Sequence, residues 1–280
     1  MKQTLQTIPR AFGVSSLRAF SVSALFRAFG VVALMLAVGQ SQPSLAQTPA
    51  AAPTPELLSV TVVSVRPEMV GEFQNFMKNT TNPALKKGGL KWREVWQSTG
   101  VADDAFEYVI VAPVGAFAEY DGPSALEKGL GAQGLASWLT KAGSLVTSVR
   151  RYLIRTRPDL SYASKRTGPP KLAVVTTVHV APNRNADFEN YIKNDYVPVM
   201  QKAEVSYFVS QLIFGGDTGT YLALTLRDSF ADLDKGPVVN QVLGPEGAMK
   251  LAQRLPAGTV NLVERSLTRF VPELSIVPEK

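Results

Sequence analysis

The chain has 280 residues, with 29 basic and 23 acidic side chains, no cysteine and a single histidine. Without cysteine it can form no disulfide, no thiolate nucleophile and no cysteine-ligated metal site. Residues 1–46 hold four of the basic side chains and no acidic one, so their removal leaves 25 against 23, a net charge of +2. A chain this close to neutral gives no electrostatic reason to expect nucleic-acid binding.

The N-terminal segment has the pattern of a secretory signal peptide. A basic region precedes the apolar run VVALMLAV at Val31–Val38, and a small-residue site, Ser44-Leu45-Ala46, follows it. The alternative is a membrane anchor, but this run is shorter than the roughly 20 residues that a spanning helix needs. We therefore expect cleavage after Ala46, export to the periplasm or the medium, and no membrane attachment afterwards. The next segment, 47–56, is Ala/Pro-rich and is expected to be an extended leader.

The remaining chain contains one pattern twice. Shifting the sequence by 115 residues, and by 113 and 114 further along, superposes its two halves; matched pairs include Pro67 and Pro182, Phe73 and Phe188, Tyr108 and Tyr221, and Arg151 and Arg265. A period of this size indicates a duplicated domain rather than a solenoid. The predicted boundaries are 57–158 for the first copy, 159–171 for the linker, 172–275 for the second copy and 276–280 for a tail.

Each copy has the same predicted order of elements. It begins with a β-branched strand (57–65 and 172–180), followed by a helix with apolar residues at three- and four-residue spacing. Two further strands, a helical region and a last strand complete the copy; we expect these strands at 90–97, 106–112 and 146–155, and at 205–213, 220–226 and 260–269. The order β-α-β-β-α-β is that of a ferredoxin-like fold, so the predicted class is α+β.

A shared phrase opens the second helical region of each copy, FAEYDGPSALEKGLGAQG at 117–134 and FADLDKGPVVNQVLGPEG at 230–247. Asp121 and Asp234 suit a helix N-cap or an Asx turn. Gly131 and Gly244 are expected to end a short helix. Phe117 and its counterpart are expected to anchor the loop in the core. A ligand-binding loop is the alternative.

Two tandem βαββαβ units at this spacing resemble the dimeric α/β-barrel superfamily. The resemblance implies that the two sheets pack face to face with the helices outside, as an intramolecular pseudo-dimer. The superfamily includes cofactor-free monooxygenases, haem-handling enzymes and binding domains, so it implies a fold more than a function. The space between the two sheets is the expected site for a small apolar or aromatic molecule.

His179 lies near the end of the first strand of the second copy. Strand alternation places it on the same face as Ala173, Val175 and Thr177. It could serve as a general base or a haem ligand. The favoured interpretation is a strand histidine with a local hydrogen bond, because one histidine makes neither a triad nor a multi-histidine metal site.

The strand LKWREVWQ at 90–97 supplies the other candidates. Arg93 and Glu94 could hold the polar end of a ligand while Trp92 and Trp96 stack on its body. An exposed edge strand protected by charges is the alternative. The corresponding strand of the second copy, at 205–213, aligns with this strand so that Tyr207 matches Trp92 and Phe208 matches Arg93. Tyr108 and Tyr221 recur in the third strand and suit either the core or a pocket.

The sequence contains no dinucleotide fingerprint, P-loop, HExxH or GxSxG motif. We therefore expect an exported small-molecule-binding or structural protein without metal or cofactor. The alternative is an enzyme similar to the cofactor-independent monooxygenases or the haem-handling members. A haem site needs only one protein ligand, so haem stays open at this point.

Overall fold

The computed structural model describes residues 54–101, 106–165 and 168–277. The predicted signal peptide and most of the leader lie outside these residues. The N-terminal half contains, in chain order, β1 (Leu57–Val65), α1 (Val70–Phe76), a π-helical turn (Met77–Thr81), α2 (Asn82–Lys87), β2 (Glu94–Ser98), β3 (Glu107–Val114), α3 (Ala125–Leu145) and β4 (Val146–Thr156).

The C-terminal half repeats this order of strands. It contains β5 (Leu172–Val180), α4 (Asn185–Tyr191), a π-helical turn (Ile192–Tyr196), α5 (Val197–Lys202), β6 (Tyr207–Phe214), β7 (Thr220–Arg227), α6 (Ala231–Asp234), α7 (Val238–Ala252) and β8 (Val260–Phe270). The first strand of each half has the bounds that the sequence predicts, because both are β-branched runs punctuated by a following proline.

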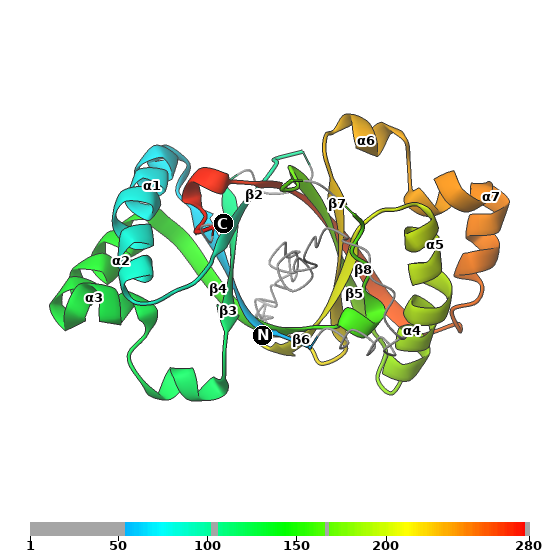
Figure 1. Ribbon diagram of the computed structural model, residues 1–280, viewed down its shortest axis with the longest axis horizontal. Coiled ribbons are helices and arrows are strands. Elements are labelled where there is room, and N and C mark those ends of the chain that lie inside the picture. Colours follow the sequence, from blue (N-terminus) through cyan, green and yellow to red (C-terminus); the bar gives the residue numbers. More distant parts are fainter. Residues whose placement is uncertain (1–53, 102–105, 166–167, 278–280) are drawn as a thin grey trace, which may run out of the picture.

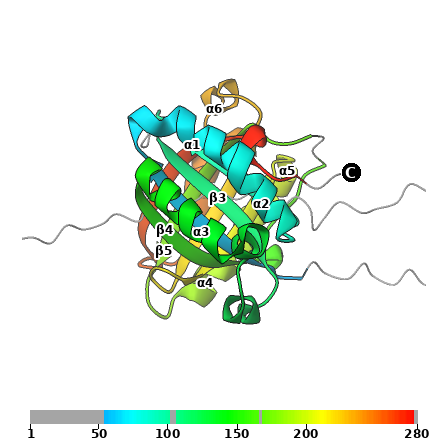
Figure 2. The same ribbon diagram turned by 90° about the vertical axis from the view of Figure 1, so that its left-hand side faces the viewer.

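The strands form one closed antiparallel barrel in the order β1-β3-β2-β8-β5-β7-β6-β4. Helices α1, α2 and α3 cover one side of it, and α4, α5 and α7 cover the opposite side (Figure 1). Figure 2 shows α1, α2 and α3 lying over the strands of the N-terminal half. The predicted fold, two ferredoxin-like units in a dimeric α/β-barrel, is confirmed.

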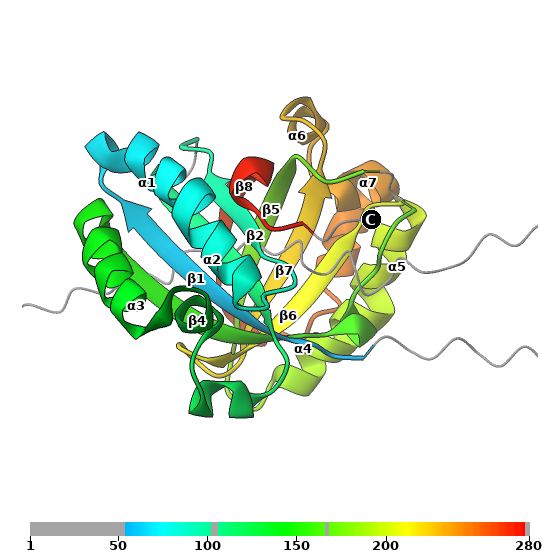
Figure 3. The ribbon, with the colours of Figure 1, turned by 60° about the vertical axis from the view of Figure 1, so that its left-hand side comes forward.

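Two seams join the halves. At one seam β2 pairs with β8, with Trp96 opposite Phe270; at the other β4 pairs with β6, with Ile154 opposite Leu212. In Figure 3 these strands continue one another around the barrel. Because β2 is paired on both sides, it is not the exposed edge strand that we considered for Arg93.

The barrel interior is an apolar core. Alternation along β1 directs Leu58, Val60 and Val62 inward and Ser59 and Thr61 toward the helices. The buried residues of the interior cluster are Leu58, Val60, Val62, Trp96, Val109, Val111, Tyr152, Ile154, Ala173, Val175, Phe208, Leu212, Leu222, Leu224 and Leu226. These side chains line the space between the sheets, where the sequence predicted a ligand cavity.

The register of β2 corrects the alignment of the two halves. Glu94 lies opposite Val111 in the first half, and Phe208 lies opposite Leu224 in the second. Val111 and Leu224 are matched positions of the two halves, so their partners must match as well. Phe208 therefore corresponds to Glu94, and Tyr207 corresponds to Arg93. Our sequence alignment, which matched Phe208 to Arg93, was one residue out of register because it placed both residues of the gap after this strand, whereas one of them falls before it.

The structure of the shared phrase, at 117–134 and 230–247, matches the prediction in part. Gly131 and Gly244 adopt positive φ values of 74° and 70° and interrupt α3 and α7, as predicted. The cap of α3 is Ser124, whose Oγ accepts from the backbone N–H of Glu127, and not Asp121. Phe117 is 45% exposed and does not anchor the loop in the core. None of the described helices is long and apolar enough to cross a membrane.

Candidate functional site

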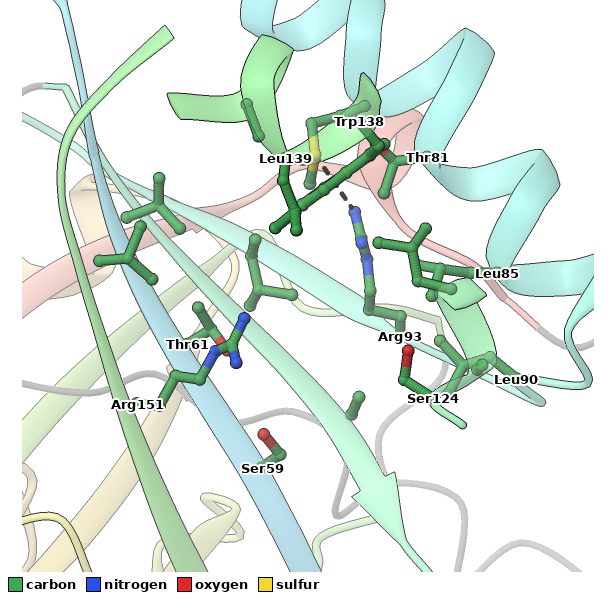
Figure 4. Close-up of a pocket in the computed structure, with 18 of the residues that line it drawn as sticks. Ser59, Thr61, Thr81, Leu85, Leu90, Arg93, Ser124, Trp138, Leu139 and Arg151 are labelled. Carbon is green, nitrogen blue, oxygen red and sulfur yellow. Dashed lines mark hydrogen bonds between the residues drawn. The ribbon is translucent and has the colours of Figure 1, made fainter. Parts of the chain in front are cut away.

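A cavity of about 920 Å³ lies in the N-terminal half, outside the barrel. Its floor is the outward face of the sheet, with Ser59 and Thr61 from β1, and α1, α2 and α3 form its walls (Figure 4). Strand alternation explains this floor, because the residues that do not face the barrel core must face the helices. The pocket is thus separated from the barrel interior by the thickness of one sheet.

Most of the pocket surface is apolar. Among the described residues that line it, the polar side chains are two arginines, several hydroxyls and the Trp138 indole, and none is a carboxylate, histidine or lysine. Among its lining residues are Phe76, Met77, Leu85, Leu90, Ile110, Tyr120, Leu135, Trp138 and Leu139. Apolar walls with a few polar groups are typical of small-molecule sites, and here the formal charge of the lining side chains is positive.

Arg93 is the most unusual residue of the pocket. Its backbone is held on both sides, because its N–H donates to the carbonyl of Ile276 at 2.9 Å and its carbonyl accepts from the N–H of Ile276 at 2.7 Å. The side chain is only 5% exposed. The C-terminal segment, predicted to be a tail, thus provides a strand-like partner that fixes Arg93 beneath the helices.

The guanidinium of Arg93 lacks an anionic partner within the described part of the chain. Its Nη2 lies 3.9 Å from the Met77 Sδ, and its Nε makes no hydrogen bond. Burial lowers the pKa of Arg93 from 12.5 to about 10. A buried arginine is normally paired, because moving an unpaired charge out of water is costly. This arrangement favours a ligand that brings a negative charge.

An aromatic wall stands beside Arg93. The Trp138 indole N–H donates to the Thr81 Oγ1 at 2.9 Å, which fixes the ring orientation. Phe76 stacks on Trp138 with ring centroids 5.8 Å apart. Both rings come from helices, α1 and α3, that pack over the sheet. Together they present a flat apolar surface suited to an aromatic or alicyclic ligand body.

Arg151 lines a different side of the pocket. It comes from β4 and is exposed, and Figure 4 shows its guanidinium beside Thr61, apart from that of Arg93. Leu139, Tyr120, Val149 and Phe214 also line the pocket and are about half exposed. These residues mark the open side of the pocket, whereas Arg93 marks the closed side.

The equivalent space in the C-terminal half is occupied by tyrosines. Tyr207 stands in place of Arg93 and Tyr196 in place of Thr81, and their ring centroids are 5.1 Å apart. Tyr191, which replaces Phe76, packs on Tyr196 at 6.4 Å. Complete burial raises the pKa of Tyr207 well above its usual range. The two halves share a fold, but their interiors beneath the helices differ.

The predicted site residues do not converge. Arg93 lines the pocket, whereas Trp96 is fully buried in the barrel core and Trp92 packs against that core. The predicted combination of Arg93 with two stacking tryptophans fails because adjacent strand residues point to opposite faces. Trp138, the tryptophan that does stand near Arg93, lies on a helix.

Tyr108 and Tyr221 are buried between the sheet and the helices. The Tyr108 hydroxyl accepts from the Gln74 Nε2 at 2.9 Å, and the Tyr221 hydroxyl donates to the Glu189 Oε1 at 2.6 Å. Phe73 and Phe188 pack on them at 4.9 and 4.8 Å. These matched contacts give both tyrosines a structural role in joining the first helix of each half to its sheet.

His179 lies at one end of the barrel interior. Its Nε2 is 3.5 Å from the Glu264 Oε2, and its Nδ1 is 3.3 Å from the Thr220 Oγ1. It shares the inward face with Thr177, as alternation predicts. His179 is therefore separated from the pocket. Within the described residues, no group of three or more histidine, aspartate or glutamate side chains could hold a metal ion.

The pocket does not fit haem in its usual ligation. The chain has one histidine and no cysteine, and His179 faces the barrel interior rather than the pocket. An imidazole or thiolate axial ligand is therefore unavailable to a group bound beneath the helices.

Sequence reasoning missed Trp138, Thr81 and Arg151 as pocket residues. Trp138 and Thr81 lie in helices and contribute to the pocket only through the packing of α3 against the first helical segment. One sequence signal was available. The first half has a small residue, Thr81, and a charged residue, Arg93, at two positions where the second half has tyrosine. Recognising that Tyr207 replaces Arg93 required the register of β2.

No protein-family model matches the chain, and a search of curated proteins finds no match. Solved structures do resemble it. Two proteins described as "putative monooxygenase", from Lactobacillus acidophilus and Fusobacterium nucleatum, are 8% and 11% identical, with TM-scores of 0.51 and 0.52. The alignments cover 78% and 77% of this chain and 94% and 92% of theirs.

An anthrone oxidase-like protein is also similar, at 13% identity and a TM-score of 0.53, over 77% of this chain and 91% of its own. At such identities the similarity shows the fold alone. The molecule has the dimeric α/β-barrel fold, and its function must be argued from its own pocket.

Proposed function

We propose that this protein binds a small organic anion with an apolar, ring-shaped or chain-like body in the pocket of its N-terminal half. One observation carries the proposal: Arg93 places an unpaired guanidinium in an apolar cavity, 5% exposed. A ligand anion would neutralise this charge, and Trp138 and Phe76 would contact its body. Hydrogen bonds to buried charged groups contribute about 1.5–3 kcal/mol each.

The lining favours binding over acid–base chemistry. General acid–base catalysis needs a group whose pKa lies near the working pH, and the lining residues that the structure describes provide arginines and hydroxyls but no carboxylate or imidazole. The ligand must therefore arrive as an anion, or be acidic enough to lose its proton to water beside Arg93.

A second candidate is cofactor-independent oxygenation, which the fold shared with the anthrone oxidase-like protein makes worth testing. In such a reaction a CH₂ group and O₂ become a carbonyl group and one water molecule. The contribution of this chain would be to hold the deprotonated substrate at Arg93. An oxygen electrode with anthrone as the probe tests this; uptake of one O₂ per anthrone, lost in Arg93→Met, is the result expected of an oxygenase.

A matched pair of fluorescent probes tests the binding proposal. N-phenyl-1-naphthylamine and 1-anilinonaphthalene-8-sulfonate share one ring system, and only the second carries a negative charge. We expect both to bind, and Arg93→Met to weaken the sulfonate by about 10- to 100-fold while leaving the neutral probe within about 2-fold. Retained binding of the neutral probe shows that the pocket is intact.

Two control variants sharpen this experiment. Arg93→Lys keeps the charge and loses the planar fork, so we expect an intermediate loss. Arg254→Met removes an exposed arginine that pairs with Asp195 in the C-terminal half and should change neither affinity. Equal loss of both probes in Arg93→Met, or no loss of the sulfonate, would contradict an anion site at Arg93.

We also propose that the chain is exported and processed after Ala46, on the basis of the N-terminal sequence pattern. The intact mass of the protein purified from the cell envelope or medium tests this. Cleavage after Ala46 leaves a chain that starts at Gln47, whereas a retained segment 1–46 would refute the proposal.

A further inference from the structure

The pocket contains a second arginine that the binding of one anion does not use. Arg93 immediately precedes β2 and Arg151 lies on β4, and both side chains line the same cavity. Within the described residues neither guanidinium has a carboxylate within ion-pair distance, in contrast to Arg157, Arg184 and Arg254, which are paired. The pocket thus has two cationic groups without counter-charges.

The two arginines lie at separate places along the pocket. In the barrel order, β3 and β1 lie between β2 and β4. Three strand spacings separate the backbones of Arg93 and Arg151 by about 14 Å across the sheet. Figure 4 shows the two guanidinium groups on different sides of the cavity, with Thr61 beside Arg151. A single compact anion is therefore poorly placed to contact both.

The surface between the arginines is apolar. Ile110 and Ala112 of β3 and Leu139 of α3 line the cavity there, and Thr61 and Ser59 of β1 add hydroxyls near Arg151. The environment also differs at the two ends, because Arg93 is buried and Arg151 is exposed. One end would hold a desolvated anion and the other an anion in contact with water.

The C-terminal half indicates that the arginine at the strand position of Arg151 points toward the helices. Arg265 occupies the position of Arg151, and its charge acts to lower the pKa of Tyr196, although burial raises that pKa overall. Arg265 therefore lies near a group beneath the helices of its own half. At this strand position the arginine faces the space between sheet and helices in both halves.

We propose that the ligand is an elongated dianion, with an acidic group at each end of an apolar body. One acid binds Arg93 at the closed side, and the other binds Arg151 at the open side. This inference rests on the proposed anion-binding function and narrows it to one class of ligand, the dicarboxylates and their equivalents. A monoanion would satisfy only the buried end.

Displacement of N-phenyl-1-naphthylamine by dodecanoate and dodecanedioate tests the proposal, because the two acids differ only in the second carboxylate. In Arg93→Met we expect both acids to weaken. In Arg151→Met we expect dodecanedioate to weaken about 2- to 5-fold, as for a solvent-exposed ion pair, while dodecanoate changes little. The ratio of the two affinities is the quantity to compare.

Arg155→Met is the matched control. It removes the same charge from the same strand, is exposed, and does not line the pocket. We expect its affinity ratio to equal that of the unmodified protein. A series of diacids with 6 to 16 carbons adds a second readout: affinity should pass through a maximum at one length, and this maximum should disappear in Arg151→Met.

The outcomes separate the two proposals. If neither acid displaces the neutral probe, anion binding itself fails. If dodecanoate binds in an Arg93-dependent way but Arg151→Met and Arg155→Met give the same affinity ratio, the dianion inference is wrong and the anion-binding function stands.

Discussion

Arg93 is the residue at which stability and function oppose each other. Its side chain is buried without an anionic partner, which is costly in the absence of a ligand. Thr81 and Met77 supply only a neighbouring hydroxyl and a weakly polar sulfur at the closed side of the pocket. A bound anion would offset the free-energy cost of burying this charge. An unpaired buried arginine is therefore expected in a binding site rather than in a structural core.

We predict that Arg93→Met stabilises the ligand-free protein. Methionine has a similar length and no charge, and a pKa of about 10 in place of 12.5 corresponds to about 3 kcal/mol of destabilisation of the charged form. Allowing for imperfect packing, we expect a gain of about 1–3 kcal/mol in the free energy of unfolding, measured by urea denaturation at pH 7. A loss of stability would contradict the prediction and mean that the Arg93 side chain makes net favourable contacts in the ligand-free protein.

The sign of the pH dependence follows from the lowered pKa. Below pH 10 the guanidinium is charged in both the folded and the unfolded chain, and the full penalty applies. Between pH 10 and 12.5 the folded protein loses the proton first, so the penalty decreases as the pH rises. The stability difference between Arg93→Met and the unmodified protein should therefore narrow from pH 9 to pH 11.

At the scale of elements, the same helix–sheet arrangement holds a cavity in one half and a packed interior in the other. Gly88 and Gly129 let α2 and α3 approach so closely that a Cβ at either position would overlap the backbone of the facing helix. The helices are therefore fixed over the sheet, and the size of the side chains beneath them decides whether a cavity exists. Tyr196 and Tyr207 fill this space in the C-terminal half.

We predict that Thr81→Tyr, Arg93→Tyr and Trp138→Leu together fill the pocket by copying the C-terminal half, in which Leu251 stands at the position of Trp138. The two rings should pack as Tyr196 and Tyr207 do, and affinity for N-phenyl-1-naphthylamine should fall at least 10-fold. The melting temperature should not decrease, because buried charge is replaced by packed rings. Thr140→Tyr, which enlarges an exposed residue of α3 outside the pocket lining, is the control and should leave probe affinity unchanged.

At the scale of the whole molecule, a salt-bridge network ties the end of the N-terminal half to the C-terminal half. Arg157 follows β4, and its N–H donates to the Val209 carbonyl of β6 at 2.8 Å. Its guanidinium binds both carboxylate oxygens of Glu189 on α4 and also contacts Asp159. Hydrogen bonds from Arg157 lower the pKa values of Glu189 and Asp159 below their usual range.

We predict an acid-dependent loss of stability that requires Arg157. Because both carboxyl pKa values are lowered on folding, their contribution is fully present above the unfolded values of 4.5 and 3.8 and is lost as the pH falls through the folded values. Arg157→Met should flatten this part of the stability curve below about pH 4.5. At pH 7 it should cost about 1–3 kcal/mol, because Glu189 loses its charged donor.

Lys141→Met is the matched control for that experiment. Lys141 pairs with Glu72, but both side chains are nearly half exposed, at 43% and 46%. Exposed pairs contribute about 0–1 kcal/mol, so this variant should follow the unmodified protein closely from pH 3 to pH 7. An equal response of the two variants would indicate a general charge effect rather than the Arg157 network.

The sequence by itself determined the order of elements and the fold class, because alternation in strands and the three- and four-residue spacing in helices are local signals that are present in each half of the chain. Gly131 and Gly244 were recognisable for the same reason, since a residue with positive φ must suit its own backbone. These features depend on near neighbours in the chain and need no knowledge of how the two halves meet.

The tertiary structure decided the location of the pocket. Ile276 fixes Arg93 from the far end of the chain, and Trp138 reaches Thr81 across 57 residues. Strand alternation alone separates Trp92 and Trp96 from Arg93, but only the closure of β2 onto β8 shows which of the two faces is turned to the helices. A site formed between helices and a sheet depends on contacts distant in sequence, which local patterns do not encode.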